Sequence, residues 1–314
     1  MQRRVIGIGE TVLDIIFEND CPKAAVPGGS TFNSLISLGR TAGKAFPDTK
    51  IMMVTQTGDD HVGDIVVNFL KDNGVETSAV SRSEGTLTNV SLAFLDSSKN
   101  AQFEFYKDPL NDSLQPETRE MLRFTKDDIV LFGSYFAVDP AKRDVTASLL
   151  HSAHRAGAII YYDVNFRRNH IPDLPQTMDN ILENCSLSTF VRGSDEDIGH
   201  IFGTKDPEKV YSEHIRPLCP NFICTCGPEP VHVFTPAGHS IFPAQKTETV
   251  STIGAGDNFN AGFIYGLLAG NVTDCNKLNP TLWGRLIHSA GLFSAEVCRS
   301  IFNYVRGLPA GLSL

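Results

Sequence analysis

The sequence has no apolar run long enough to cross a membrane and no cluster of basic residues. Its longest apolar candidate, Ala261 to Gly270, is ten residues long and rich in glycine, whereas a spanning helix needs about 18 or more apolar residues. Acidic residues outnumber basic ones by 36 to 27, for a net charge of −9. Because nucleic acids and anionic membranes attract clustered Lys and Arg, we expect neither a nucleic-acid partner nor a membrane.

The seven cysteines do not have the spacing of a metal or redox motif. The sequence contains no Cys-x-x-Cys, and Cys224 and Cys226 are one residue too close. We therefore expect reduced thiols, which are typical of cytoplasmic proteins. Residues 1–10 are basic but lack the apolar stretch of a signal peptide, and a cytoplasmic location is expected.

Short apolar runs alternate with helical patterns along most of the chain. The apolar runs cover residues 4–9, 50–54, 128–132, 158–163 and 221–225, and helical patterns cover residues 31–40, 64–73 and 144–156. Continuous apolar strands that alternate with helices are typical of a parallel sheet buried on both faces. We predict an α/β fold over residues 1–314, a single domain with a doubly wound, mostly parallel sheet covered by helices on both faces.

Two segments interrupt this alternation. Val12 to Val26 and Val90 to Tyr106 have the pattern of strands with alternating sides, and residues 96–100 favour a turn. Because these strands are inserted between βα units, they predict a small separate sheet, formed by insertions at about residues 11–27 and 86–107. Such a sheet could act as a lid over a site.

A glycine-rich turn lies next to a carboxylate late in the chain. Gly254, Ala255 and Gly256 precede Asp257, which opens a predicted helix. Backbone N–H groups at a helix N-terminus bind phosphate, and a carboxylate there can accept the proton of an attacking hydroxyl. Phosphoryl transfer to an alcohol requires both features. The simpler interpretation is a turn in which Asp257 caps the helix.

A second candidate segment lies before the first predicted helix. Gly28 and Gly29 permit close backbone contact with a ligand, and the Asn33 amide suits sugar hydroxyls. A plain helix cap by Ser30 or Thr31 explains the segment almost as well. Ahead of it, Asp14 follows the first strand, near the edge where α/β proteins bind ligands. Neither a dinucleotide fingerprint nor a complete P-loop is present.

Together, Gly28-Gly29 with Asn33 and the stretch Gly254-Ala255-Gly256-Asp257 resemble the two signatures of the ribokinase-like sugar kinases, the phosphofructokinase B family. The resemblance extends over nearly the whole chain, and further similar segments lie at residues 58–63, 74–77 and 163–167. It implies a ribokinase-like fold with a β-sheet lid. It also implies a carbohydrate kinase that uses ATP and Mg²⁺ to phosphorylate a primary hydroxyl of a small sugar.

The resemblance assigns roles to individual residues. Asp257 would be the general base, and the anion hole would consist of Gly254, Ala255 and Gly256. The sugar contacts would be Asp14, Gly28, Gly29, Asn33, Phe105 and Asp257, with Arg167 near phosphate or sugar. The nucleotide contacts would be Ser194, Thr225, Gly227, Gly256 and His288, and the metal contact would be Asp197.

Three departures from the family pattern have consequences. Ser251 replaces an Asp six residues before the base, which makes a monovalent cation doubtful. The family's Asn-x-x-Glu is Ser194 to Asp197 here, so magnesium would meet a shorter carboxylate, in part through water. Pro228 replaces the second glycine after Gly227, which implies a differently shaped nucleotide loop.

The identity of the sugar depends on residues 103–114, which resemble a stretch of fructokinases with Lys107 in place of Arg. Fructose is therefore the favoured substrate. The alternatives are 2-keto-3-deoxygluconate kinase, ribokinase, or a non-catalytic sugar- or nucleotide-binding protein on the same fold. The exposed strand edges of the lid are compatible with a homodimer that pairs through it.

Overall fold

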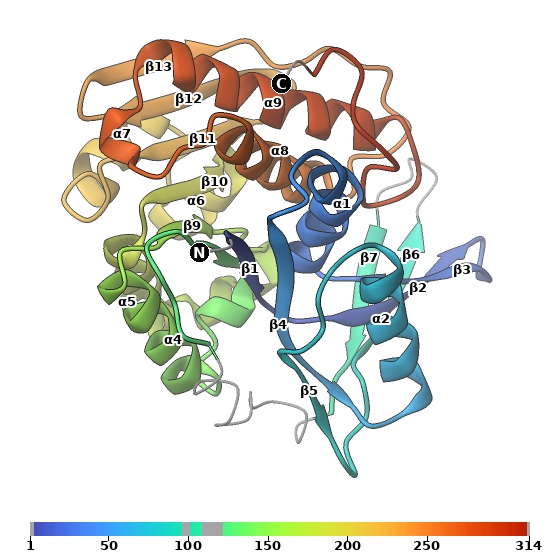
Figure 1. Ribbon diagram of the computed structural model, residues 1–314. Helices are drawn as coiled ribbons and strands as arrows, with labels where there is room; N and C mark the ends of the chain where they lie inside the picture. The colour runs from blue at the N-terminus through green and yellow to red at the C-terminus, as the bar shows by residue number, and fades with distance from the viewer. Residues whose placement is uncertain (1–2, 96–100, 109–121, 313–314) are drawn as a thin grey trace.

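The computed structural model describes residues 3–95, 101–108 and 122–312, and a nine-stranded sheet lies at its centre (Figure 1). The strand order is β13-β12-β11-β10-β9-β8-β1-β4-β5, in which the strands from β11 to β5 run parallel and the final hairpin is antiparallel. The strands are β1 (Arg4–Ile8), β4 (Lys50–Gly58), β5 (Val80–Ser83), β8 (Ile129–Gly133), β9 (Ile159–Asp163), β10 (Phe190–Ser194), β11 (Phe222–Cys226), β12 (Glu229–Thr235) and β13 (Gly238–Phe242).

Helices cover both faces of this sheet. One face packs against α1 (Ser30–Ala45), α2 (His61–Asp72), α8 (Ala255–Ala269) and α9 (Pro280–Cys298). The other packs against α4 (Arg143–Arg155), α5 (Leu174–Leu187), α6 (Asp195–Phe202) and α7 (Pro207–Val210). Successive strand residues such as Val5 and Ile6 belong to opposite cores, because side chains alternate along a strand. The predicted doubly wound α/β fold is confirmed.

The two interrupting segments form a separate four-stranded sheet of order β3-β2-β6-β7, on the right of Figure 1. Its strands are β2 (Val12–Glu18), β3 (Cys21–Gly28), β6 (Val90–Leu95) and β7 (Ala101–Tyr106). The parallel pair of β2 and β6 joins the two segments, with Asp14 opposite Ser91, and the stacked rings of Phe17 and Phe94 lie 5.0 Å apart. The prediction of a small separate sheet is confirmed, while the turn expected at residues 96–100 lies outside the described residues.

The main differences from the predicted elements are in their ends. The helix expected over residues 31–40 runs from Ser30 to Ala45. The helix expected to open at Asp257 begins two residues earlier, at Ala255 after the N-cap Gly254. Asp257 does not cap the helix, because its side chain turns toward α1 rather than back over the first turn of α8.

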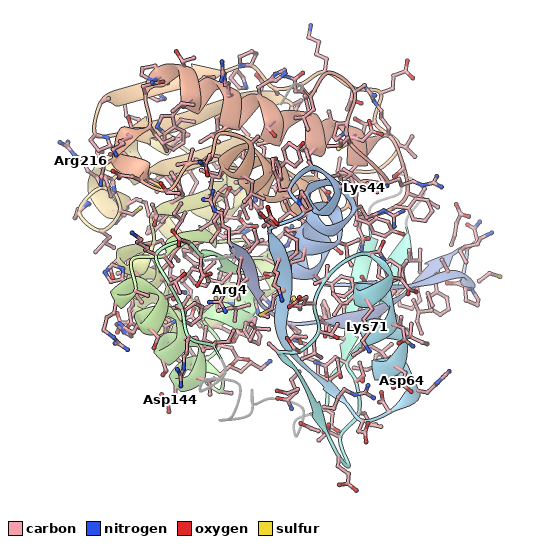
Figure 2. All side chains as sticks on the ribbon, viewed as in Figure 1. Arg4, Lys44, Asp64, Lys71, Asp144 and Arg216 are labelled. Carbon is pink, nitrogen blue, oxygen red and sulfur yellow. The ribbon has the colours of Figure 1, made fainter. Side chains whose placement is uncertain are left out.

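Three shorter 3-10 helices and one π-type turn complete the described chain. They are Tyr135–Ala137, Arg168–Asp173, Cys275–Lys277 and, for the π-type turn, Tyr211–Ile215. Charged side chains lie on the outer surfaces of the helical layers, as Figure 2 shows for Lys44, Asp64, Lys71, Asp144 and Arg216. Within the residues that the structure describes, no helix has the length and apolar character needed to cross a bilayer.

Candidate active site

The candidate site lies where the carboxyl ends of the parallel strands meet the N-terminus of α8. This edge receives polar residues from several strands, because β1, β8, β9, β10 and β11 all run in the same direction. Helices α1 and α8 pack side by side above it, and the small sheet begins directly after β1 (Figure 1). Segments that are far apart in the sequence therefore surround one position.

Asp257 is the best-fixed carboxylate of this site. Its Oδ1 accepts a hydrogen bond from Ser30 Oγ at 2.7 Å, and its Oδ2 accepts one from Asn33 Nδ2 at 2.8 Å. Its main-chain carbonyl accepts a third from Ser34 Oγ at 2.7 Å. The simpler helix-cap interpretations are wrong, because the N-caps of α1 and α8 are Gly29 and Gly254 and neither helix has a side-chain cap.

Burial raises the pKa of the Asp257 carboxyl above its usual value. The residue is 8% exposed, and loss of hydration is the largest cause of the shift. The hydrogen bonds from Asn33 and Ser30 oppose it, nearby Asp163 adds to it, and the positive charge of Arg167 reduces it. A carboxylate with raised proton affinity is suited to accept a proton from a hydroxyl.

The turn before Asp257 has backbone geometry that glycine permits. Gly254 has φ +78°, and a Cβ atom there would lie 2.6 Å from the Asn303 carbonyl oxygen. Asn258 Nδ2 donates to the carbonyl oxygens of Gly254 and Asn303, at 2.8 and 2.9 Å, which holds the turn against the C-terminal segment. The first N–H groups of α8 have no acceptor within the helix. Such groups can bind an anion.

Asp14, Gly28 and Asn33 form a polar group beside Asp257. The Asp14 carboxylate accepts a hydrogen bond from Ser91 Oγ and contacts the Gly28 backbone so closely that a side chain at Gly28 would collide with it. Burial raises the pKa of Asp14 to about 6, and the charge of Asp257 contributes to the shift. The buried Oδ1 of Asn33 has no hydrogen-bond partner in the described part of the chain. These groups can receive the hydroxyls of a polyol.

The residues expected at the nucleotide and metal lie at the ends of β10 and β11. Ser194 and Asp197 form a capping box at α6, in which Asp197 Oδ2 accepts from Ser194 N at 2.7 Å and Ser194 Oγ accepts from Asp197 N at 3.0 Å. Burial raises the pKa of Asp197. Thr225 Oγ1 accepts from Arg192 Nη2 at 2.6 Å. No cluster of three or more His, Cys, Asp or Glu that could hold a metal occurs in the described ranges.

The remaining expected residues lie farther toward the surface. Gly227 has φ +59° in the tight turn that joins β11 to β12. His288 is exposed on α9, with Nδ1 3.3 Å from Gln245 Nε2. Arg167 is exposed and Phe105, on β7, is 50% exposed.

Sequence reasoning missed a buried polar network beneath the glycine turn. Arg192 is 6% exposed, and its Nη1 donates to Asp163 Oδ1 at 3.0 Å. Asp163 Oδ2 accepts from Asn260 Nδ2 at 2.7 Å, which attaches α8 to β9. The sequence signal that could have indicated this network is Arg192 itself, a charged residue in the middle of the buried strand β10, Phe190–Ser194.

Two residues beside this network have strained backbone geometry. Ser134 has φ +62° directly after β8, and Asn165 has φ +39° shortly after β9. Asn165 Nδ2 donates to Ser134 Oγ at 3.3 Å. Non-glycine residues in this region are concentrated at functional sites, and this pair lies at the edge that carries Asp163.

A buried carboxylate lies beside a helix N-terminus whose N–H groups can bind an anion, at the edge of a doubly wound sheet. Transfer of a phosphoryl group to an alcohol requires both features. Comparison with protein families identifies the class of enzyme. Residues 23–277 match the pfkB family of carbohydrate kinases. The chain belongs to this family, and it is a phosphotransferase that acts on a sugar hydroxyl.

Within the family, the chain resembles fructokinases. It is 26% identical to the probable chloroplastic fructokinase-6 of Arabidopsis thaliana, over 98% of this chain and 79% of the relative. It is 27% identical to fructokinase-1 of Zea mays, over 74% of this chain and 71% of the relative.

Solved structures share the fold over nearly the whole chain. A Vibrio cholerae fructokinase, crystallised with fructose, ADP and calcium, has a TM-score of 0.83 at 20% identity, covering 98% of this chain and 96% of its own. An aminoimidazole riboside kinase of Salmonella enterica, complexed with its riboside and an ATP analogue, has a TM-score of 0.77 at 21% identity, covering 99% and 97%.

Proposed function

We propose that this protein transfers the γ-phosphoryl group of ATP to the primary hydroxyl of fructose. The observation that supports this most strongly is the position of Asp257, whose carboxylate is fixed by Ser30 and Asn33 immediately after the glycine turn of α8. One carboxylate thus adjoins both the group of polyol-binding side chains and the anion-binding turn. The proposal assigns the sugar to the former and the transferring phosphoryl group to the latter.

Asp257 accepts the proton of the sugar hydroxyl as that oxygen attacks phosphorus. Its raised pKa makes the proton transfer more favourable. The N–H groups of Gly256 and Asp257 at the start of α8 stabilise the charge of the phosphoryl oxygens, while the N–H of Ala255 donates to the Thr252 carbonyl at 3.2 Å. Arg167, whose charge already acts on the Asp257 carboxyl, adds a positive charge at the mouth of the site.

For the sugar, we assign hydrogen bonds to Asp14 and to the free Oδ1 of Asn33. Gly28 and Gly29 allow the ring to approach the backbone. Phe105, from β7, would cover the apolar face of the sugar once the small sheet closes as a lid.

For the nucleotide, we assign Ser194, Thr225 and Gly227, with His288 near the base. Magnesium fits the donor set at Asp197, because this ion is commonly held by one or two carboxylates together with water and substrate phosphates. Both hydrogen bonds from Ser194 go to Oδ2 of Asp197, so Oδ1 would be the oxygen that helps to hold the ion. Bound magnesium would neutralise charge on the phosphates.

Lys107 favours a neutral sugar over an acidic one. Its Nζ lies 2.8 Å from Glu10 Oε1, and Asn89 Nδ2 donates to the same oxygen at 3.0 Å. The Lys107 ammonium is held by Glu10 and would have to leave this pair to bind a sugar carboxylate. The substrate is therefore a neutral ketohexose rather than 2-keto-3-deoxygluconate, in agreement with the fructokinases among the relatives.

The small sheet also supports an expectation about assembly. Strands β3 and β7 are its edges, and unpaired strand edges favour pairing with a second chain. We propose a homodimer that forms through this sheet. Sedimentation velocity tests it, since a monomer at all concentrations would contradict it.

A substrate panel tests the proposed function. ATP consumption is measured with fructose, ribose, 2-keto-3-deoxygluconate and nucleosides, in magnesium, with and without potassium. We expect the highest kcat/KM with fructose. A preference for another sugar would correct the substrate, and the absence of consumption with every acceptor would favour a protein that only binds sugar or nucleotide.

A further inference from the structure

Arg192 places a buried positive charge beneath the proposed phosphoryl-transfer site. It is the third of the five residues of β10, with 6% of its surface exposed. Its Nη1 is paired with Asp163 Oδ1 at 3.0 Å, and its Nη2 donates to Thr225 Oγ1 at 2.6 Å. Its Nε is buried and has no hydrogen-bond partner among the described residues.

The guanidinium lies directly against the glycine turn. A Cβ atom on Gly256 would be 2.9 Å from Nη1 and 3.2 Å from Nη2 of Arg192. Glycine at position 256 therefore allows the charge to contact the backbone whose N–H groups open α8. On another side, the guanidinium carbon lies 5.8 Å from the centre of the Phe259 ring.

The surroundings do not require a cation for stability alone. The strand β10 is central in a parallel sheet, where apolar side chains normally fill the space, and burying an ion pair commonly stabilises a protein less than apolar packing does. The partner Asp163 already accepts a hydrogen bond from Asn260. The buried Nε of Arg192, which has no hydrogen-bond partner among the described residues, leaves one donor of the guanidinium available for a further interaction.

We propose that Arg192 is a positioning residue for phosphoryl transfer. It supplies a fixed positive charge behind the Gly254–Gly256 turn, and it holds that turn in register with Thr225 on the neighbouring strand β11. The anion that it serves is the polyphosphate of a nucleoside di- or triphosphate. This inference rests on the proposed kinase function and extends it to a residue outside the two glycine-rich segments.

Arg192 would act on the polyphosphate through its charge. A polyphosphate carries several negative charges, and the chain as a whole has a net charge of −9. A positive electrostatic potential that attracts the phosphates must therefore come from charges close to the site. A charge in a buried environment acts more strongly than one in water. The bond to Thr225 and the contact with Gly256 connect the strand assigned to the nucleotide with the turn assigned to the phosphoryl group.

Two substitutions separate charge from packing. Arg192→Gln keeps a polar donor but removes the charge, whereas Arg192→Lys keeps the charge but loses the planar, multidentate head. The dissociation constants of ADP and adenosine are measured by calorimetry for each variant, together with kcat and the affinity for fructose. The ratio of the two nucleotide affinities does not depend on the folded fraction, so it is informative even if a variant is less stable.

For Arg192→Gln, we expect the preference for ADP over adenosine to fall about tenfold or more. We expect kcat to fall about a hundredfold, the effect of removing one group that stabilises a transition-state anion, while fructose affinity changes little. Arg192→Lys should recover most of the ADP preference. Arg4→Met is the matched control. Arg4 also forms an ion pair, with Asp128, but it is the first residue of β1 and so lies at the end of the strand away from the candidate site.

An unchanged ADP preference in Arg192→Gln would overturn the proposal, as would equal losses for ADP, adenosine and fructose, which indicate a structural role only. A wild-type protein that binds ADP no better than adenosine would instead contradict the kinase function itself. If the wild-type protein phosphorylates fructose and the Arg192→Gln variant does so with the same kcat, the role of Arg192 is rejected and the kinase function remains intact.

Discussion

At the scale of single residues, the site concentrates negative charge where water is largely excluded. The charge of Asp257 raises the pKa of Asp14, and burial is the largest cause of the raised pKa of both carboxyls. Arrangements of this kind reduce stability, and they persist where ligand binding requires them. The free Oδ1 of Asn33 is a further unsatisfied group at the same place.

Asp257→Asn tests the proposed base. We expect kcat to fall by about 10²–10⁴, because the amide cannot accept the hydroxyl proton. Sugar affinity should be largely kept, since Oδ1 of the new amide can still accept from Ser30. If Asn33 flips so that its Oδ1 accepts from the new amide, its Nδ2 turns toward the sugar and can donate to a hydroxyl oxygen instead. Steady-state kinetics and sugar titration measure the two effects, and near-normal turnover would reject the role of Asp257.

Asp14→Asn should separate stability from binding. The pKa of Asp14 is about 6 in the folded protein and near 3.8 when unperturbed, so the folded state holds the proton more tightly between these values. The stability associated with protonated Asp14 is present below about pH 4 and is lost as the pH rises through 6. Removing the carboxylate should therefore raise Tm by a few degrees at pH 8, but not at pH 4.

Thermal unfolding of both proteins at the two pH values provides the measurement. Fructose affinity should fall in the same variant, because Asp14 is assigned to the sugar. A Tm that does not change at pH 8 would show that Ser91 already compensates the buried charge.

At the scale of elements, the start of α8 combines a left-handed residue with close backbone contacts. Gly254 provides the φ of +78°, and Asn258 attaches the turn to the C-terminal segment through the Asn303 carbonyl. Ser37 on α1 donates to Asn258 Oδ1 and accepts from Val305 N. The first turn of α8, which carries the amides proposed to bind an anion, is therefore held by α1 and by the C-terminal segment.

Gly254→Ala should disturb this element in two ways. A left-handed alanine costs about 1–2 kcal/mol, and its Cβ would approach the Asn303 carbonyl to 2.6 Å. We expect a lower Tm and a reduced kcat. Gly43→Ala is the control, because Gly43 lies within α1 with no atom near its Cβ position, where alanine stabilises a helix by about 0.5–1 kcal/mol. Similar Tm values for both variants would contradict the prediction.

At the scale of the whole molecule, the small sheet is built from two segments that are inserted between elements of the main sheet. The parallel pairing of β2 with β6 unites segments separated by more than sixty residues. The polar contacts of Asp14 with Ser91 and of Lys107 with Glu10 cross from one segment to the other. Sugar bound at Asp14 would therefore stabilise the small sheet as a unit.

Hydrogen exchange measured by mass spectrometry tests this coupling. With saturating fructose, we expect slower exchange in β2 and β6, because ligand contacts suppress local opening of the small sheet. Peptides from α4 and α5, on the opposite side of the main sheet, should exchange at unchanged rates. Protection spread equally over all these peptides would indicate global stabilisation and contradict a lid.

Much of the architecture was predictable from sequence because its signals are local. Continuous apolar runs fixed the positions of β1, β8, β9 and β11, and Gly74 and Gly157, both with φ +75°, follow the two helices that they were expected to end. The helix boundaries were less predictable. The first turn of α8 was placed too late because Asp257 has the pattern of a cap, while its actual partners lie on α1.

The sequence by itself determined the α/β fold, the small separate sheet and the two glycine-rich segments that carry the family resemblance. Only the tertiary structure decided which side chains of these segments contact one another. Asn33 donates to Asp257 across 224 positions of sequence, and Arg192 contacts Gly256 although no local pattern connects them. The physical reason is that periodicity and turn chemistry act over a few residues, whereas the partners of a buried charge are set by how strands and helices pack.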